Sequence, residues 1–289
     1  AAAARRGIPV VVANARMSQR SFRGYSRVRP LVSRMLGRLG IVSARSEEDA
    51  DRFRSLGARD VRVAGSMKFD GVRGDRDAPE VRRLRGLAGI TPGDVVFLAG
   101  STQAPEERLA AEAYISLRDT HPALRLVIVP RHVERTAEVA AMLDRLGLGW
   151  QARSRLETGG ADRGSRVLLV DTTGELSSWW GTAAIAFVGG SLDGTRGGQN
   201  MLEPAAYGAA ISFGPHTSNF RDEVARLLAA DAAVVVEDGT ALTAFVGRCL
   251  ADPAWAAGLG DRAATLVAAQ RGATAATARL VIERLMQTA

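Results

Sequence analysis

Short runs of apolar, mostly β-branched residues alternate along the chain with longer amphipathic stretches. In the first part of the chain the short runs, which we expect to be strands, are residues 8–13, 41–44 and 61–64. The intervening stretches 21–38 and 46–56 have the periodicity of helices, and Ser46 with Asp49 resembles a capping box at the start of the second. Such alternation is typical of a parallel sheet covered by helices.

A second series of apolar runs follows a segment of glycine, charge and proline at residues 66–79. These runs, expected to be buried parallel strands, are residues 95–99, 125–129, 167–170, 185–188, 209–213 and 233–236. The end of the chain, residues 253–287, is rich in alanine and leucine and is expected to form helices with breaks near Gly260 and Gly272. The fold class predicted by the pattern is α/β, with two Rossmann-like domains built on parallel sheets.

Length and composition fit a globular protein of two domains, or of one large α/β domain plus part of another, rather than a membrane bundle or a disordered chain. The 289 residues are 46% hydrophobic and 24% charged. No apolar run approaches the roughly 18 residues that a spanning helix needs. Cys249 is the single cysteine, which excludes an internal disulfide and suits a reducing compartment, and we expect it to pack on a helix.

The net charge of +7 comes almost wholly from arginine, because Lys68 is the only lysine. A basic surface favours anionic partners such as lipid phosphates or the negative leaflet of a bilayer. Nucleic acid is not expected as a partner, since aromatic residues make up only 5% and no helix-turn-helix, RNP or zinc-finger pattern occurs. Asp75-Arg76-Asp77 fits a D-x-D metal pattern by chance within the linker, and without a His/Cys cluster we predict no metal site.

Polar and glycine-rich motifs directly follow five of the expected strands. They are Gly100-Ser101-Thr102, Pro130-Arg131-His132, Asp171-Thr172-Thr173-Gly174-Glu175, Gly189-Gly190-Ser191 and Gly214-Pro215-His216. In an open parallel sheet such loops share one edge, where ligands bind. Loops between strands and helices are rich in glycine and capping residues in any case, but the number of glycines exceeds what single turns require.

Two of these motifs have simple structural interpretations beside the functional one. Free amides in the turn from Thr173 to Leu176 could hold a phosphate, or Thr173 could be an ordinary N-cap with Glu175 in the first turn. Arg131 could present its guanidinium to a phosphate or a cytosine carbonyl, or it could be solvated. We expect His132 to orient other groups rather than to act as a base.

Asn200 and Glu203 stand at the start of a short expected helix, with Pro204 in its first turn. The structural interpretation is a capping box between the two side chains. The functional one is a pair of ribose hydroxyls bound by Glu203, since a carboxylate accepts two hydroxyl protons at once.

Ten short segments, in chain order, carry a resemblance to a known family: NARMSQRS, SEEDADRF, GSMKFD, GST, PRH, TGEL, FVGGS, GGQN, LEPAA and FGPHTSNFRD. Together they resemble the 3-deoxy-D-manno-octulosonic acid (Kdo) transferases, which use CMP-Kdo in lipid A assembly. The chain departs from the family pattern after GST, where Gln103 and Ala104 replace the usual His and Gly, and in the next glycine box, where Gln199 and Met201 replace His and Pro.

The resemblance implies a GT-B glycosyltransferase that inverts the anomeric centre while moving Kdo from CMP-Kdo to a lipid A precursor, at the cytoplasmic face of the inner membrane. It implies no cofactor and no covalent enzyme intermediate. It places Arg16, Ser18 and Arg20 toward the acceptor. The donor-binding residues that it implies are Ser101, Thr102, Arg131, His132, Thr173, Gly174, Glu175, Leu176, Gly190, Asn200 and Glu203.

The resemblance also suggests how the chain divides. Residues 1–67 would be the remainder of an incomplete acceptor-side domain, 68–80 a linker, 81–270 the donor domain, and 271–289 a terminal helix that crosses back to the first domain. Because the chain begins AAAARRGIPV without methionine, we expect a membrane anchor and the acidic catalytic base to lie upstream of Ala1. The base is therefore not assigned, and a fragment of this kind is expected to be inactive alone.

Two other interpretations stay open at the level of sequence. One is a UDP-sugar GT-B enzyme or an epimerase, which would need room for a second phosphate. The other is a non-catalytic nucleotide-binding fragment. Preference for CMP over UDP would separate the first from the Kdo transferases, and the upstream coding sequence would separate an enzyme from a scaffold.

Overall fold

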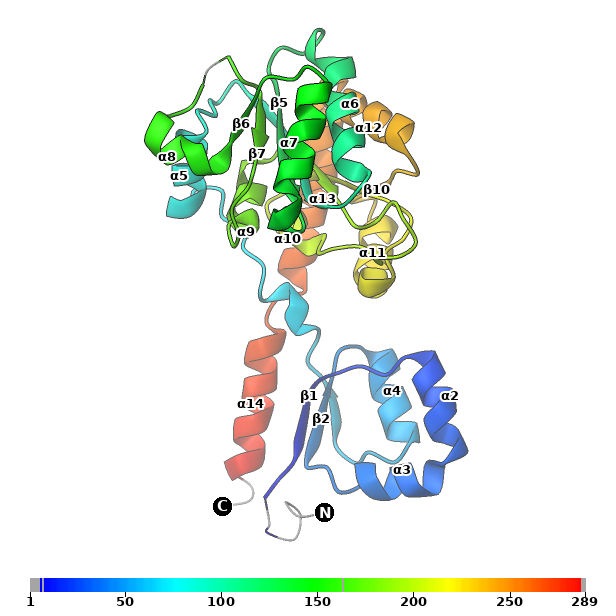
Figure 1. The fold of residues 1–289 in the computed structure, drawn as a ribbon. Coiled ribbons are helices and arrows are strands. Elements are labelled where there is room, and N and C mark those ends of the chain that lie inside the picture. The colour runs from blue at the N-terminus through cyan, green and yellow to red at the C-terminus, as the bar shows by residue number, and fades with distance from the viewer. Residues whose placement is uncertain (1–5, 7, 163, 287–289) are drawn as a thin grey trace. The chain divides into compact units, whose positions relative to one another are not determined.

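A computed structural model describes residues 6, 8–162 and 164–286, which form two compact units (Figure 1). The smaller unit contains residues 1–71 and 268–289, and the larger contains residues 72–267. The division falls inside the segment 68–80 that we expected to be a linker. Both sheets formed by the described residues are wholly parallel, as predicted.

The smaller unit is a three-stranded sheet with helices on both faces. Its strands are β1 (Val11–Ala15), β2 (Ile41–Ala44) and β3 (Val61–Val63), in that spatial order. Helices α2 (Gln19–Arg27), α3 (Arg29–Leu36) and α4 (Glu47–Ser55) cover one face, and α14 (Ala273–Met286) packs on the other (Figure 1). A buried hydrogen bond of 2.9 Å joins the hydroxyls of Ser43 in β2 and Thr277 in α14.

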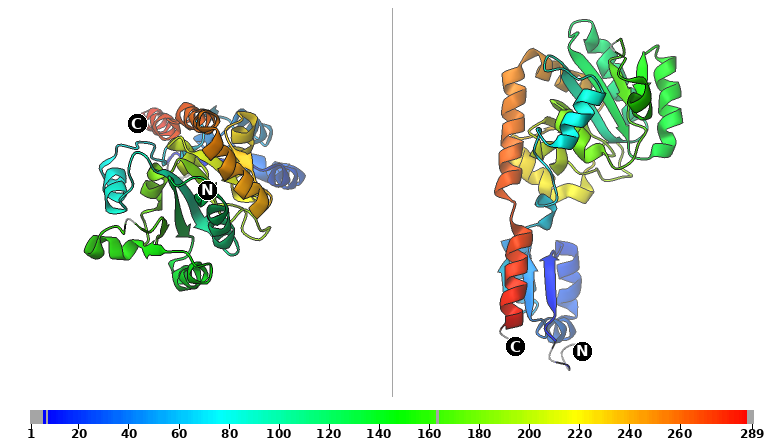
Figure 2. Two further views of the ribbon diagram at one scale, coloured as in Figure 1. Left: turned by 90° about the horizontal axis from the view of Figure 1, so that it is seen from above. Right: turned by 90° about the vertical axis from the view of Figure 1, so that its left-hand side faces the viewer.

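The larger unit is a seven-stranded doubly wound sheet with the spatial order β10-β9-β8-β4-β5-β7-β6. Its strands are β4 (Val95–Thr102), β5 (Leu124–Pro130), β6 (Trp150–Ala152), β7 (Val167–Leu169), β8 (Ile185–Val188), β9 (Ala210–Phe213) and β10 (Val234–Val235). Helices α6 (Glu106–Arg118), α7 (Thr136–Arg145) and α12 (Gly239–Ala251) lie on one face (Figures 1 and 2).

The opposite face of this sheet carries the remaining helices. They are α5 (Pro79–Leu87), α9 (Leu176–Trp179), α10 (Leu202–Ala206), α11 (Arg221–Ala229) and α13 (Pro253–Ala269), while α8 (Leu156–Gly159) follows β6 (Figure 2). The core between the layers consists of fully buried side chains such as Phe97, Leu126, Ile128 and Phe187. Each buried aliphatic or aromatic side chain of this kind stabilises the fold by about 1.5–3 kcal/mol. Cys249 is buried on α12, as predicted, and burial raises the pKa of its thiol to about 12.

Three sequence predictions of secondary structure were wrong in detail. The helix expected over 21–38 is two helices, because the chain turns at Val28 before Pro30 opens α3. The three-residue edge strand β6 was missed, since such a short run has no measurable periodicity. No break occurs at Gly260: α13 runs through it because this glycine lets the helix approach the backbone of Gly208, whose carbonyl oxygen would lie 2.1 Å from an added Cβ.

One local prediction was right and shows how α4 begins. The Ser46 hydroxyl accepts the N–H of Asp49 at 3.1 Å and so caps α4. Arg76, the central residue of the D-x-D pattern, binds the backbone carbonyls of Tyr207, Gly181 and Ala183 at 2.7–3.0 Å. It therefore anchors its segment to the larger unit. Across the described residues, no helix is long and apolar enough to cross a membrane.

Candidate functional site

The strand order of the larger unit reverses between β4 and β8. On one side of β4 lie β5, β7 and β6, in that spatial order, whereas β8 lies on the other side of β4 and is followed outward by β9 and β10. Loops that leave the carboxyl ends of two such strands diverge, and the crevice between them is where open α/β sheets bind ligands. The motifs predicted from the sequence follow β4, β5, β7, β8 and β9 at this edge.

A buried carboxylate, Glu106, joins the two loops at this crevice. It is the first residue of α6 and is only 2% exposed. One of its oxygens accepts the N–H groups of Gln103 (2.9 Å) and Gly190 (2.7 Å), and the other accepts those of Ser191 (2.9 Å) and Leu192 (3.1 Å). Burial raises the pKa of Glu106, and these backbone donors oppose the rise.

Glycine is required in the loop after β8 because other groups approach its backbone closely. A Cβ at Gly189 would lie 2.6 Å from both Thr102 Cα and a Glu106 oxygen. Gly190 has φ 64°, in the left-handed region that glycine adopts without strain. A Cβ there would lie 3.2 Å from Nε2 of Gln199 and 3.6 Å from Nε2 of Gln103. The two glutamines that depart from the Kdo transferase pattern thus meet at Gly190.

The rest of this loop folds back on the turn that follows β9. Gly198 donates to the Gly190 carbonyl at 2.7 Å, and His216 donates its backbone N–H to Ser191 at 3.0 Å. The side chain of Asn219 donates to the carbonyl of Arg196 at 2.8 Å. The FGPH turn and the glycine-rich segment therefore form one lobe at the sheet edge, as their common position after parallel strands predicted.

The loops after β4 and β5 adjoin this lobe. Ser101 has φ 53°, an uncommon value for a residue with a side chain, at a register irregularity in β4. Thr102 is fully buried, its hydroxyl has no partner, and its carbonyl accepts the N–H of Arg131 at 2.9 Å. The side chains of Arg131 and His132 are exposed directly beyond β5. Four predicted donor-binding residues, Ser101, Thr102, Arg131 and His132, thus lie on adjacent strand ends.

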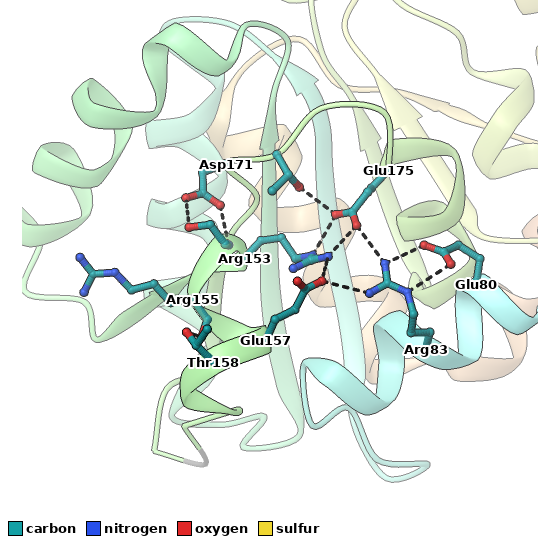
Figure 3. A network of polar contacts seen from close by, with 10 residues as sticks. Glu80, Arg83, Arg153, Arg155, Glu157, Thr158, Asp171 and Glu175 are labelled. Carbon is teal, nitrogen blue, oxygen red and sulfur yellow. Dashed lines mark hydrogen bonds and ion pairs between the residues drawn. The ribbon is translucent and has the colours of Figure 1, made fainter.

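In the loop after β7, Thr173 and Gly174 are exposed. The Glu175 carboxylate instead binds other side chains of the protein (Figure 3). The Glu175 carboxylate accepts from Arg153 at 2.6 and 2.8 Å, from Arg83 at 3.0 Å and from the Thr172 hydroxyl at 2.8 Å. Burial alone would raise the pKa of Glu175, but these donors and the charge of Arg153 hold it below its usual range.

The structure corrects the expected cap of the helix in this loop. Glu175 rather than Thr173 occupies the N-cap position of α9, and neither side chain caps it. Helix α9 begins at Leu176 and has only four residues, so its dipole is short. Any phosphate contact in this loop would therefore depend on individual amides of Thr173 and Gly174.

Asn200 and Glu203 interact, but not as a capping box, because Met201 is the N-cap residue of α10 and no side chain caps this helix. The Asn200 side chain donates to Glu203 at 3.0 Å and accepts the N–H of Leu202 at 3.2 Å. Burial raises the pKa of Glu203, while hydrogen bonds from the side chains of Asn200 and Trp180 oppose the rise. Trp180 also packs over β4: a Cβ at Gly100 would lie 2.5 Å from its ring. Glu203 is thus linked through Trp180 to the β4 end.

In the smaller unit, Arg16, Ser18 and Arg20 follow the carboxyl end of β1, and all three are exposed. The Ser18 hydroxyl caps α2 by accepting the N–H of Ser21 at 3.1 Å. Ser18 therefore has a structural role as the cap of α2, and Arg16 and Arg20 lie two residues before and after it in the chain.

A cavity of about 570 Å³ lies farther along the same edge, beside the outer strand β6. Its lining includes Thr136, Trp150, Arg155 and Asp171. Asp171 accepts both the N–H and the hydroxyl of Ser154, at 2.8 and 2.6 Å, so its oxygens are largely occupied. The lining shares Asp171 with the motif after β7 but includes no residue of the loops after β4 and β8. Within the described parts of the chain, no cluster of three or more potential metal-ligating side chains occurs.

Sequence reasoning missed Glu106 and Arg153. A glutamate in the first turn of a helix is an ordinary complement to the helix dipole, and its partners at Gly190 to Leu192 are 84–86 residues away. The only signal was its position four residues beyond the GST motif, at the start of the helix.

Two parallel α/β units, with glycine-rich loops gathered at the switch point of the larger sheet, define the GT-B glycosyltransferase class. A crystal structure of Anabaena Alr3699/HepE in complex with UDP and glucose matches 98% of this chain and 73% of its own, with a TM-score of 0.52 and 14% identity, and so shows the fold alone. The crystal structure of the C-terminal CMP-Kdo binding domain of WaaA from Acinetobacter baumannii is 29% identical, with a TM-score of 0.60, over 65% of this chain and 97% of that domain.

Sequence comparison identifies the family. Residues 1–71 match the family described as 3-Deoxy-D-manno-octulosonic-acid transferase (kdotransferase). The 3-deoxy-D-manno-octulosonic acid transferase of Bordetella pertussis is 34% identical over 282 residues, which are 96% of this chain and 64% of the relative. The chain belongs to the Kdo transferase family and spans less than two thirds of the length of this relative.

Proposed function

We propose that the protein transfers Kdo from CMP-Kdo to a lipid A precursor in lipopolysaccharide assembly, at the cytoplasmic face of the inner membrane. The observation that carries the proposal is the buried Glu106, which joins the β4 and β8 loops at the sheet edge where the β5 and β7 strands also end, in a chain of this family. The similarity to a solved CMP-Kdo binding domain supports CMP-Kdo as the donor.

The proposed donor site uses the exposed ends of these loops. Arg131 would meet the phosphate or the cytosine carbonyl with its planar fork, and the amides of Thr173 and Gly174 would face the phosphate. Glu203, held by Asn200, would accept the ribose hydroxyls. The left-handed Ser101 and the buried hydroxyl of Thr102 would shape the floor between the diverging loops.

The reaction proposed is a direct displacement with inversion. The acceptor hydroxyl oxygen forms a bond to the anomeric carbon of Kdo, the bond from that carbon to the phosphate oxygen breaks, and its electron pair leaves with CMP. A base takes the hydroxyl proton. The role of the donor site is to hold CMP in line and to stabilise the negative charge that grows on its phosphate, through the preorganised amides and Arg131. In the smaller unit, Arg16, Ser18 and Arg20 are proposed to face the phosphates of the acceptor.

Isothermal titration calorimetry with CMP and UMP tests the donor assignment on the chain itself. We expect CMP to bind more tightly than UMP, because cytosine presents two adjacent acceptors, its carbonyl oxygen and ring N3, to the donor fork of Arg131, whereas N3 of uracil carries a hydrogen. UMP and CMP binding with equal affinity would overturn the assignment of CMP-Kdo as donor.

A further inference from the structure

The loop that follows β7 presents two backbone N–H groups at the carboxyl edge of the sheet. Residues 171–175 lead from β7 to α9, and Thr173 and Gly174 near the centre of this loop are exposed. In the part of the chain that the structure describes, no group accepts the backbone N–H of either residue. Two exposed donors serve a ligand best when the loop already has its shape, because ordering it on binding would reduce affinity.

One end of this loop is held by Ser154. The short 3-10 helix η3 (Arg153–Arg155) follows β6, the edge strand beside β7. Ser154 donates its backbone N–H to one carboxylate oxygen of Asp171 at 2.8 Å and its hydroxyl to the other at 2.6 Å. Both oxygens of Asp171, the first residue of the loop, are therefore directed toward η3 (Figure 3).

The other end of the loop is held by Arg153, the neighbour of Ser154. The buried Arg153 side chain donates to the two oxygens of Glu175 at 2.8 and 2.6 Å (Figure 3). The same carboxylate accepts the Thr172 hydroxyl at 2.8 Å, so the pair also fixes the residue before Thr173. A bidentate pair of arginine and carboxylate restricts direction as well as distance.

We call Arg153 and Ser154 the η3 brace. The brace fixes the loop at residues 171 and 175, and the two exposed amides lie between these points. Gly174 has φ 84°, in the left-handed region that glycine adopts without strain, and an added Cβ would meet nothing within 4 Å. Glycine is therefore needed here for the backbone conformation of the loop and not to make room for a neighbour.

We propose that Arg153 and Ser154 are positioning residues for the donor: through Glu175 and Asp171 they hold the loop so that its two exposed amides receive the phosphate of CMP. The inference deepens the proposed function and rests on it for the nucleotide as ligand. Donors that are oriented in advance stabilise a negative charge without a cost of reorganisation. The brace should therefore strengthen the binding of the phosphate and leave that of the nucleoside unchanged.

Calorimetry with CMP and cytidine isolates the contribution of the phosphate. The ratio of CMP affinity to cytidine affinity measures what the phosphate adds in each protein. Arg153→Met removes the guanidinium but keeps an apolar stem, and it should lower this ratio roughly tenfold while cytidine affinity stays within about twofold of the parent. Ser154→Ala removes only the hydroxyl bond to Asp171 and should lower the ratio roughly threefold.

Arg125→Met is the matched control. The Arg125 side chain is 12% exposed and pairs with Asp94 at 3.1 Å, so it too is a shielded arginine with a carboxylate partner. It stands near the start of β5, at the opposite edge of the sheet. Its replacement should lower stability and leave the ratio of CMP to cytidine affinity at the parent value. Because Ser154 is exposed, Ser154→Ala should stay folded even where Arg153→Met does not.

The outcomes separate the brace from general stability and from the donor assignment. Equal losses of CMP and cytidine affinity in Arg153→Met, or an unchanged ratio in Ser154→Ala, would overturn the proposal. An equal fall of the ratio in Arg125→Met would also overturn it, because the effect would then follow stability. If the parent binds CMP and UMP equally, the donor assignment fails, and the ratio of UMP to uridine affinity then tests the brace: a fall in both brace variants supports it, and no fall overturns it.

Discussion

The carboxylate of Glu106 accepts the backbone N–H of Gly190 at 2.7 Å, across 84 positions of sequence. The same side chain holds three further N–H groups, of Gln103, Ser191 and Leu192. One buried group therefore fixes the ends of β4 and β8 relative to each other at the point where the sheet reverses its order. The crevice proposed to bind the donor is shaped by the protein before any ligand arrives, which lowers the cost of ordering the loop on binding.

Glu106→Gln is expected to lower both stability and CMP affinity. The amide keeps one acceptor oxygen but turns an N–H₂ group toward donors that need an acceptor, which leaves buried N–H groups unmatched at about 1–3 kcal/mol each. We expect the free energy of unfolding to fall by about 2–4 kcal/mol. The CMP dissociation constant should rise roughly tenfold, because the Gly190 loop is no longer held in place. Urea unfolding and calorimetry measure the two effects.

Glu107→Gln provides the control for this experiment. Glu107 follows Glu106 in α6, is equally buried at 2% exposed, and binds Arg135 rather than the crevice. The Glu107→Gln variant should be less stable than the parent. Under conditions where both variants are folded, it should bind CMP with the affinity of the parent. An equal loss of CMP affinity in the Glu106→Gln and Glu107→Gln variants would mean that Glu106 acts only through global stability. Glu106→Asp is not expected to restore CMP affinity, because the shorter side chain cannot reach all four donors.

Glu203→Ala is expected to weaken CMP binding by about 1–3 kcal/mol, the usual penalty for a polar partner left unmatched. Because burial raises the pKa of Glu203, the pH dependence has a definite sign. A carboxylate accepts ribose hydroxyls best when ionised, so CMP affinity of the parent should increase as pH rises through the raised pKa and then level off. Glu203→Gln should remove that dependence.

Stability should respond to Glu203 in the opposite sense. A carboxyl whose pKa is raised by folding stabilises the folded state most below its unfolded pKa, and this contribution is lost as pH rises through the folded pKa. Titration calorimetry over about pH 4.5–8 and urea unfolding over the same range check the two trends. CMP affinity that is independent of pH in the parent, or unaltered by Glu203→Ala, would contradict the ribose contact.

The ion pairs around Glu175 predict a large effect of Glu175→Gln on stability. Its side chain is 17% exposed and its partner Arg153 only 5%, so neutralising it leaves a buried guanidinium without its main counter-charge. Breaking a buried pair costs about 3–5 kcal/mol. Since the pKa of Glu175 is lowered in the folded state, this contribution is present above the unfolded pKa and is lost as pH falls through the folded pKa. The difference between parent and variant should therefore disappear on acidification.

Glu157→Gln is the matched comparison, because Glu157 bonds the same two arginines, Arg153 at 3.0 Å and Arg83 at 3.3 Å (Figure 3). Its side chain is 58% exposed, so solvent screens the interaction and we expect a loss below about 1 kcal/mol. If urea unfolding gave equal losses of unfolding free energy for the two substitutions, the stronger contribution expected from the less exposed Glu175 would be contradicted.

The fold was largely predictable because its strands are apolar runs bounded by glycine and proline. Strand β8 was predicted at its observed residues, Ile185–Val188, because all four side chains are buried and both faces of the sheet are covered. Strand β6 and the course of α13 depended instead on tertiary contacts. Trp150–Ala152 gains its strand hydrogen bonds from β7, and Gly260 lies inside α13 where the close backbone of Gly208 leaves no room for a Cβ.

The position of the site was predictable, but its internal links were not. Motifs that follow parallel strands must reach one edge, and this placed Thr102, Arg131 and Gly190 together without knowledge of any side-chain contact. In contrast, the local sequence did not indicate that Glu106 would also accept the amides of Gly190, Ser191 and Leu192, or that Arg153 would bind Glu175, since these links join residues that are far apart in sequence.

The last prediction concerns Gln199, which lies with Gln103 beside Gly190 where the family pattern has histidine in both places. Glutamine donates and accepts hydrogen bonds but does not titrate near neutral pH. If position 199 only orients ligands, Gln199→His in the complete enzyme should leave the pH profile of Kdo transfer unchanged. The profile should be taken as the difference from the parent, so that transitions common to both proteins cancel. Gln199→Asn, which cannot titrate, controls for the change in side-chain size. A new transition between about pH 6 and 7 that occurs with histidine and not with asparagine would show that this position takes part in the proton chemistry.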